Sequence, residues 1–168
     1  MKKIVLLLAV LCCGMVFSQN EQLAQNYFDK GDFEKARLSY ESLLKAQPYN
    51  YVYFQRIIEC YQQLEQYKQA EQVLEDRIKT FQQASLWVEL GYNYQLQKDN
   101  AQAQKFYEKA FDKIVKFPNE VYMIASTFER HSLFENALKS YQTAQQVEPN
   151  FNFNFQMALL YGQLGNTD

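Results

Sequence analysis

Apolar and aromatic positions recur along this chain as pairs of short helical stripes. The first stripe is Leu23, Ala24, Tyr27 and Phe28, and the second is Phe33, Ala36, Tyr40, Leu43 and Leu44. Such spacing places each set on one face of an α-helix. Gly31-Asp32, between the stripes, suits a turn and a helix start, and Pro48 cannot continue the second helix. The pattern predicts two antiparallel helices joined by a tight turn.

The same pair of stripes returns with a period of 33 or 34 residues. A small residue marks the second stripe each time, as Ala36, Ala70, Ala103 and Ala137. An aromatic series runs in step, as Tyr27, Tyr61, Tyr94, Phe128 and Tyr161. A small side chain allows two helix backbones to approach closely. A period of this length is typical of a solenoid, in which neighbouring helix pairs cover one another's apolar faces.

We expect four full repeats and the first helix of a fifth. Their ranges are about 19–50, 51–83, 84–117, 118–150 and 151–168. All three prolines, Pro48, Pro118 and Pro149, fall between repeats. The second helix of the third repeat runs on to Phe117, so we expect it to be about one turn longer than the others. The second repeat departs most from the pattern, because Glu65 replaces the turn glycine. Further repeats are expected to follow Asp168.

These residues resemble the tetratricopeptide repeat family. The tract WVELGYNYQLQKDNAQAQKFYEKAF carries its tryptophan, Leu-Gly pair, tyrosine, alanine, tyrosine and alanine in order, and GDFEKA matches the same pattern. The resemblance covers residues 19–168. It implies an all-α fold, a right-handed α-solenoid of antiparallel helix pairs. It also implies a concave groove, lined by the first helix of each pair, that binds a protein or peptide.

Carried over position by position, the resemblance assigns twelve side chains to this groove. They are Gln25, Phe28, Gln55, Glu59, Gln62, Val88, Tyr92, Gln95, Tyr122, Ser126, Glu129 and Phe155. Glu21 and Gln25 stand where some relatives hold a terminal carboxylate with basic and amide groups, so we expect no carboxylate clamp. Amides can pair with a peptide backbone, and tyrosines are frequent interface anchors. The alternative is that the glutamines are solvated helix formers and the tyrosines have no binding role.

Residues 1–18 predict a secretory signal peptide. Lys2 and Lys3 precede an apolar stretch from Ile4 to Phe17, and we expect cleavage after Ser18. This stretch is shorter than the roughly 20 residues of a membrane-spanning helix. A lipid anchor at Cys13 is the alternative, but Leu11-Cys12 lacks the small residues that precede a lipidated cysteine. The predicted location is the periplasm or cell envelope of a bacterium, with an extracellular location as an alternative.

Charge and composition exclude several function classes. The chain has 17 basic and 19 acidic residues; loss of Lys2 and Lys3 leaves 15 basic residues and a net charge of −4. This balance argues against a nucleic-acid partner. Outside the leader, the chain has one cysteine, Cys60, and one histidine, His131. These two residues cannot form an intrachain disulfide or a zinc site, and we expect no metal or cofactor.

We find no catalytic constellation in the sequence. His131 is predicted to be a surface histidine in a turn, and Ser126 and Glu129 belong to the same short segment, so these three do not form a triad. Cys60 is interpreted as a small buried hydrophobic residue. No glycine-rich phosphate loop occurs. The chain is therefore not expected to be an enzyme.

The leading hypothesis is a non-catalytic protein–protein interaction scaffold of the cell envelope that binds a peptide or partner protein in its groove. One alternative is an exported sensory N-terminal module of a larger receptor. Another is envelope glycan capture, with Tyr92 and Tyr122 stacking on sugar rings.

Overall fold

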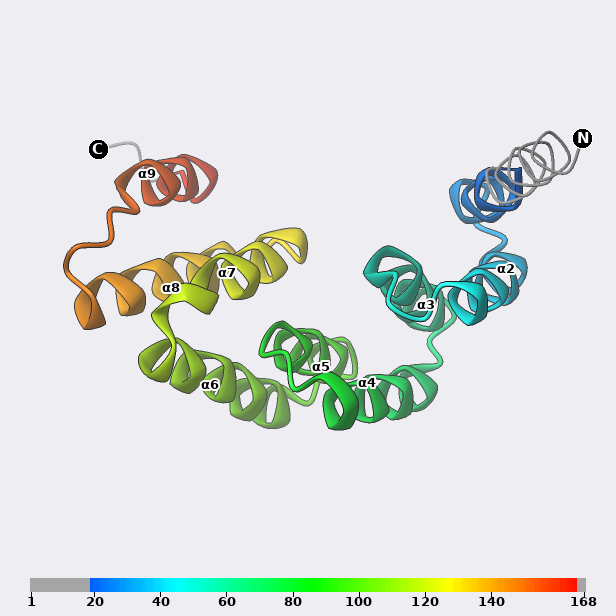
Figure 1. Cartoon of the computed structure of the whole chain (residues 1–168), viewed down its shortest axis with the longest axis horizontal. Coiled ribbons are helices and arrows are strands. Elements are labelled where there is room, and N and C mark those ends of the chain that lie inside the picture. Colours follow the sequence, from blue (N-terminus) through cyan, green and yellow to red (C-terminus); the bar gives the residue numbers. More distant parts are fainter. Residues whose placement is uncertain (1–18, 166–168) are drawn as a thin grey trace, which may run out of the picture. The chain divides into compact units, whose positions relative to one another are not determined.

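The computed structural model describes residues 19–165, and within this range every regular element is helical. The helices are residues 19–29, α2 (Phe33–Ala46), α3 (Tyr51–Gln63), α4 (Tyr67–Phe81), α5 (Ser85–Leu96), α6 (Asn100–Lys116), the 3₁₀ turn η1 (Pro118–Glu120), α7 (Val121–Arg130), α8 (Phe134–Val147) and α9 (Asn154–Gln163). Figure 1 shows them following one another as helical hairpins. The predicted all-α fold of antiparallel helix pairs is confirmed. The predicted leader, residues 1–18, lies outside the described residues.

The chain divides into two compact bodies, with the boundary inside α4 after Ala70. In the N-terminal body, α2 packs against α3. Its core is formed by Ala24, Ala36, Tyr40, Leu43, Tyr53, Ile57 and Cys60. Cys60 is buried, as its position in an apolar helix predicted, and burial raises the pKa of its thiol to about 12. The thiol is therefore protonated and unreactive at neutral pH.

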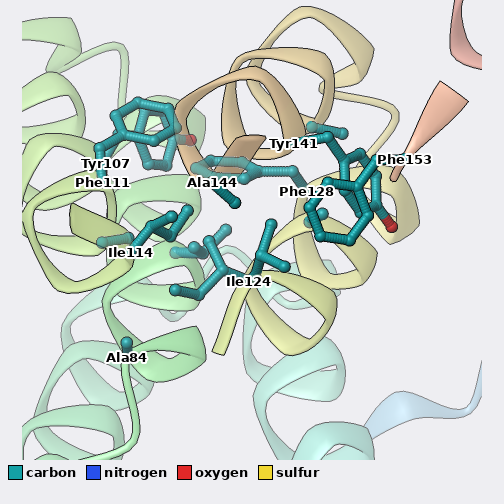
Figure 2. Packing of buried hydrophobic residues seen from close by; sticks show 14 of the residues in the cluster. Ala84, Tyr107, Phe111, Ile114, Ile124, Phe128, Tyr141, Ala144 and Phe153 are labelled. Carbon is teal, nitrogen blue, oxygen red and sulfur yellow. The ribbon is translucent and has the colours of Figure 1, made fainter. Parts of the chain in front are cut away.

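The C-terminal body repeats one packing scheme across α5 to α9. Within hairpins, α5 packs on α6 and α7 on α8; between hairpins, α5 packs on α7, α6 on α8, and α8 on α9. Phe128 of α7 packs against α6, with its ring centroid 5.1 Å from that of Tyr107 and 5.5 Å from that of Phe111. Figure 2 shows these side chains among the other buried residues of the cluster. Each hairpin thus completes the core of the next.

The turns within the repeats share one backbone geometry. The residue at the turn has a left-handed φ, between 56° and 76°, in all five cases: Gly31, Glu65, Lys98, Ser132 and Gly165. In the first four turns the next residue donates its N–H to the carbonyl of the recurring aromatic residue, at 2.8 to 3.0 Å: Asp32 to Tyr27, Gln66 to Tyr61, Asp99 to Tyr94, and Leu133 to Phe128. This is the Schellman C-cap. Glu65 therefore adopts the turn that Gly31 forms in the first repeat.

The second helix of the third repeat is longer than its counterparts, as predicted. α6 has 17 residues, whereas α2 and α8 have 14 each. It ends at Lys116, before Phe117 and Pro118, and η1 connects it to α7. Among the described residues, none of the helices has both the length and the apolar character needed to cross a membrane.

The paired helices α5 and α6 approach each other closely at Gly91. A methyl group placed on Gly91 would lie 2.4 Å from Cε1 of Tyr107 and 3.1 Å from the carbonyl oxygen of Ala103. The ring of Tyr107 is buried in the core. By contrast, a methyl group on Gly162 of α9 would meet no atom within 4 Å.

We expect Gly91→Ala to lower the free energy of unfolding by about 1–3 kcal/mol, because the buried Tyr107 ring must move to admit the methyl group. Gly162→Ala is the matched control. It should leave stability unchanged or raise it by up to about 1 kcal/mol, since alanine is the better helix former. Urea denaturation followed by circular dichroism measures both changes. A Gly91→Ala protein as stable as the parent would show that the two helices are not in close contact here.

Candidate protein-binding surface

Three of the predicted groove residues hold the two helices of a repeat together. In each case a buried tyrosine on the second helix donates its hydroxyl hydrogen bond to a side-chain oxygen on the first: Tyr40 to Gln25 at 2.9 Å, Tyr107 to Gln95 at 2.9 Å, and Tyr141 to Glu129 at 3.4 Å. A buried hydroxyl without a partner would be destabilising. Burial raises the pKa of Tyr40 and of Tyr141 to about 12. Gln25, Gln95 and Glu129 therefore have a structural role within their own hairpins.

Phe28 and Glu59 meet at Arg56 in the N-terminal body. The Arg56 guanidinium lies 4.4 Å from the Phe28 ring centroid, and its Nη1 is 2.7 Å from Oε2 of Glu59. Gln55 is half-buried, and Gln62 is 8% exposed. Phe28 and Glu59 are therefore engaged by Arg56, and Gln62 is almost closed to solvent.

The assignment of Val88 to the groove is wrong. Its side chain is 0% exposed and belongs to the core of the C-terminal body. The reason is that α5 packs against both α6 and α7. Residues around most of its circumference are buried as a result: Ser85, Leu86, Val88, Glu89, Leu90, Gly91 and Asn93.

His131 is not the surface residue that the sequence suggested. Its side chain is only 8% exposed, and its Nε2 lies 2.8 Å from Oε2 of Glu89, whose side chain is 5% exposed. Arg130 contacts the other carboxylate oxygen of Glu89. The ring of Tyr92 stacks on the imidazole, with centroids 3.8 Å apart and an interplanar angle of 18°. Tyr92, which we predicted as a groove residue, is therefore half-buried and has one face covered.

This cluster joins α5 to the C-terminal end of α7. Burial alone would raise the pKa of Glu89, but the hydrogen bond with His131 and the electrostatic interactions with His131 and Arg130 together lower the pKa below its ordinary value. The carboxylate is therefore ionised at neutral pH and paired on both oxygens. Since Glu89 and His131 are almost closed to solvent, we interpret the cluster as an interhelical ion pair. The sequence signal was a glutamate inside the apolar tract Trp87–Tyr94.

The remaining three predicted residues face solvent. Tyr122 of α7 is 54% exposed, Phe155 of α9 is 72% exposed, and Ser126 is also exposed. We call these three residues the exposed first-helix surface. Tyr122 packs edge-on against Phe153, with ring centroids 5.5 Å apart, so α7 lies next to the segment that precedes α9.

A cavity of about 230 Å³ lies beside Tyr122. It is lined by Asn119, Val121, Tyr122, Asn150, Phe151, Asn152 and Phe153. The segment 150–153 was not among the predicted site residues. The signal was present in the strict alternation of asparagine and phenylalanine from Asn150 to Phe155. Among residues 19–165, no group of three His, Cys, Asp or Glu side chains is placed to hold a metal ion.

Comparisons with known proteins agree with this architecture. A family model described as the TT21 fifth ARM repeats domain matches residues 20–101. Solved structures similar to the chain include MamA 41-end from Desulfovibrio magneticus RS-1, at 12% identity over 90% of this chain and 86% of that one, with a TM-score of 0.50. BtubC (BKLC) from P. vanneervenii has 17% identity over 92% of this chain and 75% of that one, also with a TM-score of 0.50. No curated protein sequence matches the chain. At these identities the likenesses establish the helical-repeat fold alone.

We expect replacement of Glu89 by glutamine to be destabilising in a pH-dependent way. Because the pKa of folded Glu89 lies below its ordinary value of 4.5, its stabilising contribution is present above about pH 4.5 and is lost as the pH falls further. Near pH 6, Glu89→Gln should lower the free energy of unfolding by about 2 kcal/mol. This is less than for a fully buried pair, since one third of the Arg130 side chain is exposed.

The measurement is urea denaturation of both proteins between about pH 6 and pH 3, where the difference in stability should shrink towards acid. Glu108→Gln is the control, because Glu108 forms an ion pair with Lys139 at the surface, with both side chains about half exposed. A stability difference for Glu89→Gln that stays constant over this range would contradict the assignment of an ionised, paired Glu89.

Proposed function

Because this chain is a tetratricopeptide-like repeat protein, we propose that it is a non-catalytic scaffold that binds a protein or peptide partner. The binding site that we propose is the exposed first-helix surface, formed by Tyr122 and Ser126 of α7 and Phe155 of α9. Helical-repeat folds of this type generally present such surfaces to other proteins. We further propose that the partner is a component of the bacterial cell envelope.

The observation that carries this proposal is the exposure of Tyr122 and Phe155. Most aromatic side chains of the repeats are buried in the cores or packed against them. Tyr122 and Phe155 instead leave 54% and 72% of their surface open to water, on elements that meet around Phe153. Aromatic side chains in this setting supply large, rigid contact areas with few rotatable bonds, which is the character of interface hot spots.

Other parts of the predicted groove are less suited to binding. Gln25, Gln95 and Glu129 are engaged by tyrosine hydroxyls, and Tyr92 is covered on one face by His131. A ligand that used these groups would first have to displace contacts that stabilise the fold. Repeats four and five therefore offer the better surface for a partner.

We expect the double variant Tyr122→Ala/Phe155→Ala to bind its partner at least about tenfold more weakly, since each lost anchor contributes of order 1 kcal/mol or more. Partners are first captured on the immobilised protein from an envelope extract of the source bacterium and identified by mass spectrometry. The affinity of the purified partner is then measured by calorimetry for both proteins.

Tyr49→Ala is the matched control, because Tyr49 is an exposed tyrosine of the N-terminal body. This variant should bind like the parent. If the double variant remains folded by circular dichroism and keeps full affinity for the partner, the exposed first-helix surface is not the binding site.

The proposed location rests on the leader sequence and has its own test. Expression of the full chain with a C-terminal tag, followed by fractionation and N-terminal sequencing, should give a mature protein that starts at Gln19 in the envelope fraction. An intact N-terminus at Met1 in the cytoplasmic fraction would refute export.

A further inference from the structure

The cavity beside Tyr122 has a preformed aromatic wall. Phe153 is buried at its centre, with ring centroids 5.5 Å from Tyr122, 5.2 Å from Tyr141 and 5.6 Å from Phe151. The contacts of Phe153 with Tyr122 and Phe151 are edge-to-face, at 77° and 75°. This is a favourable geometry for aromatic pairs. Because the rings already support one another, the wall needs no rearrangement to receive a ligand.

Three asparagine side chains border the same cavity and keep hydrogen-bonding capacity. Nδ2 of Asn150 donates to Glu148 at 3.0 Å, and Oδ1 of Asn152 accepts from the backbone N–H of Asn154 at 3.1 Å. The Oδ1 of Asn150, the Nδ2 of Asn152 and the whole amide of Asn119 make no hydrogen bond within residues 19–165. The cavity therefore offers both donors and acceptors. A peptide bond presents the complementary pair, one C=O and one N–H.

Size and charge restrict what this cavity can hold. Its volume of about 230 Å³ is below the roughly 300–1,000 Å³ typical of pockets for drug-sized ligands, so one side chain fits better than a complete cofactor. None of its seven lining residues is charged. A charged side chain would lose its hydration there without gaining a counter-charge, which is unfavourable.

We propose that this cavity, the asparagine–aromatic pocket, anchors an extended peptide segment of the partner protein through one uncharged aromatic side chain. That ring extends the edge-to-face array formed by Tyr122, Phe151 and Phe153. The amides of Asn119, Asn150 and Asn152 hold the peptide bonds on either side. The inference rests on the proposed function and deepens it, because it states the chemistry that the binding surface recognises.

A peptide fits this pocket better than a glycan does. A sugar ring presents several hydroxyl groups. These hydroxyl groups form stronger hydrogen bonds with charged protein groups than with neutral ones. The pocket provides amides and the hydroxyl of Tyr122, and none of its lining residues is charged. A peptide needs a small number of amide hydrogen bonds together with an apolar contact, and the pocket offers both.

The test is a selection of random 12-residue peptides displayed on phage against the protein, purified after expression with its own leader. We expect the enriched peptides to share an aromatic residue flanked by uncharged residues. The best sequence is then synthesised with a fluorescent label, and its dissociation constant is measured by anisotropy. Replacing its aromatic residue by glutamate should weaken binding at least about tenfold.

Variants of the protein then locate the site. Asn119→Ala and Tyr122→Ala should each raise the dissociation constant of the labelled peptide by about fivefold or more. Both positions are exposed, so folding should be preserved, and Tyr49→Ala should bind like the parent. Enrichment of acidic or basic motifs, no enrichment at all, or unchanged affinity in both pocket variants would overturn the proposal.

Two outcomes separate this inference from the proposed function. One outcome is that binding of the labelled peptide is unchanged by Asn119→Ala and Tyr122→Ala but weakened by Phe155→Ala. In that case the pocket assignment is wrong, while the proposed scaffold role still holds. Calorimetry with cellohexaose and chitohexaose tests the glycan alternative. Sugar binding that is abolished by Tyr122→Ala, without any selected peptide, would replace the peptide assignment.

Discussion

A single helical hairpin of this chain cannot cover its own apolar faces, and the rest of the structure depends on this constraint. Phe128 illustrates it, because the rings that enclose this α7 residue, Tyr107 and Phe111, belong to α6 of the preceding repeat. Burial of apolar surface is the main stabilising term, and here part of it requires contact between neighbouring repeats. Within a repeat, a small residue such as Gly91 allows the paired helices to approach closely.

Polar interactions then define how the helices pair. Tyrosine hydroxyls of the second helices are bound by Gln25, Gln95 and Glu129 of the first helices, so the same bond recurs in three repeats. A buried Glu89 that contacts both Arg130 and His131 joins α5 to α7. These polar groups lie on first helices, but each is already bound to another side chain of the same chain. Exposed aromatic surface and hydrogen-bonding amide groups remain available to a partner around Tyr122 and the segment 150–155.

The turns show why sequence reasoning succeeded for the architecture. Each first helix is followed by a residue with a left-handed φ and by a Schellman hydrogen bond to the recurring aromatic residue. Both features depend only on positions within one repeat. The geometry tolerates Glu65, Lys98 and Ser132 at a cost of about 1 kcal/mol each, because the packed hairpins on either side hold the turn in place. The period, the helix pairs, the longer α6 and the burial of Cys60 could therefore be predicted from local patterns.

The assignment of individual side chains was less reliable because burial depends on how many neighbours a helix has. The resemblance assigned Val88 and Tyr92 to the groove-lining face of α5, but contact with α7 buries the first and half-covers the second. The same contact brings His131 to Glu89, 42 positions away in the chain. The sequence by itself determined the repeat, its turns and the apolar face of each helix, since these follow from spacing within about 34 residues. Only the tertiary structure decided which polar groups are bound by other side chains of the fold and which remain exposed near Tyr122. The physical reason is that contacts such as Glu89–His131 join residues far apart in the chain, and no sequence pattern marks their spacing.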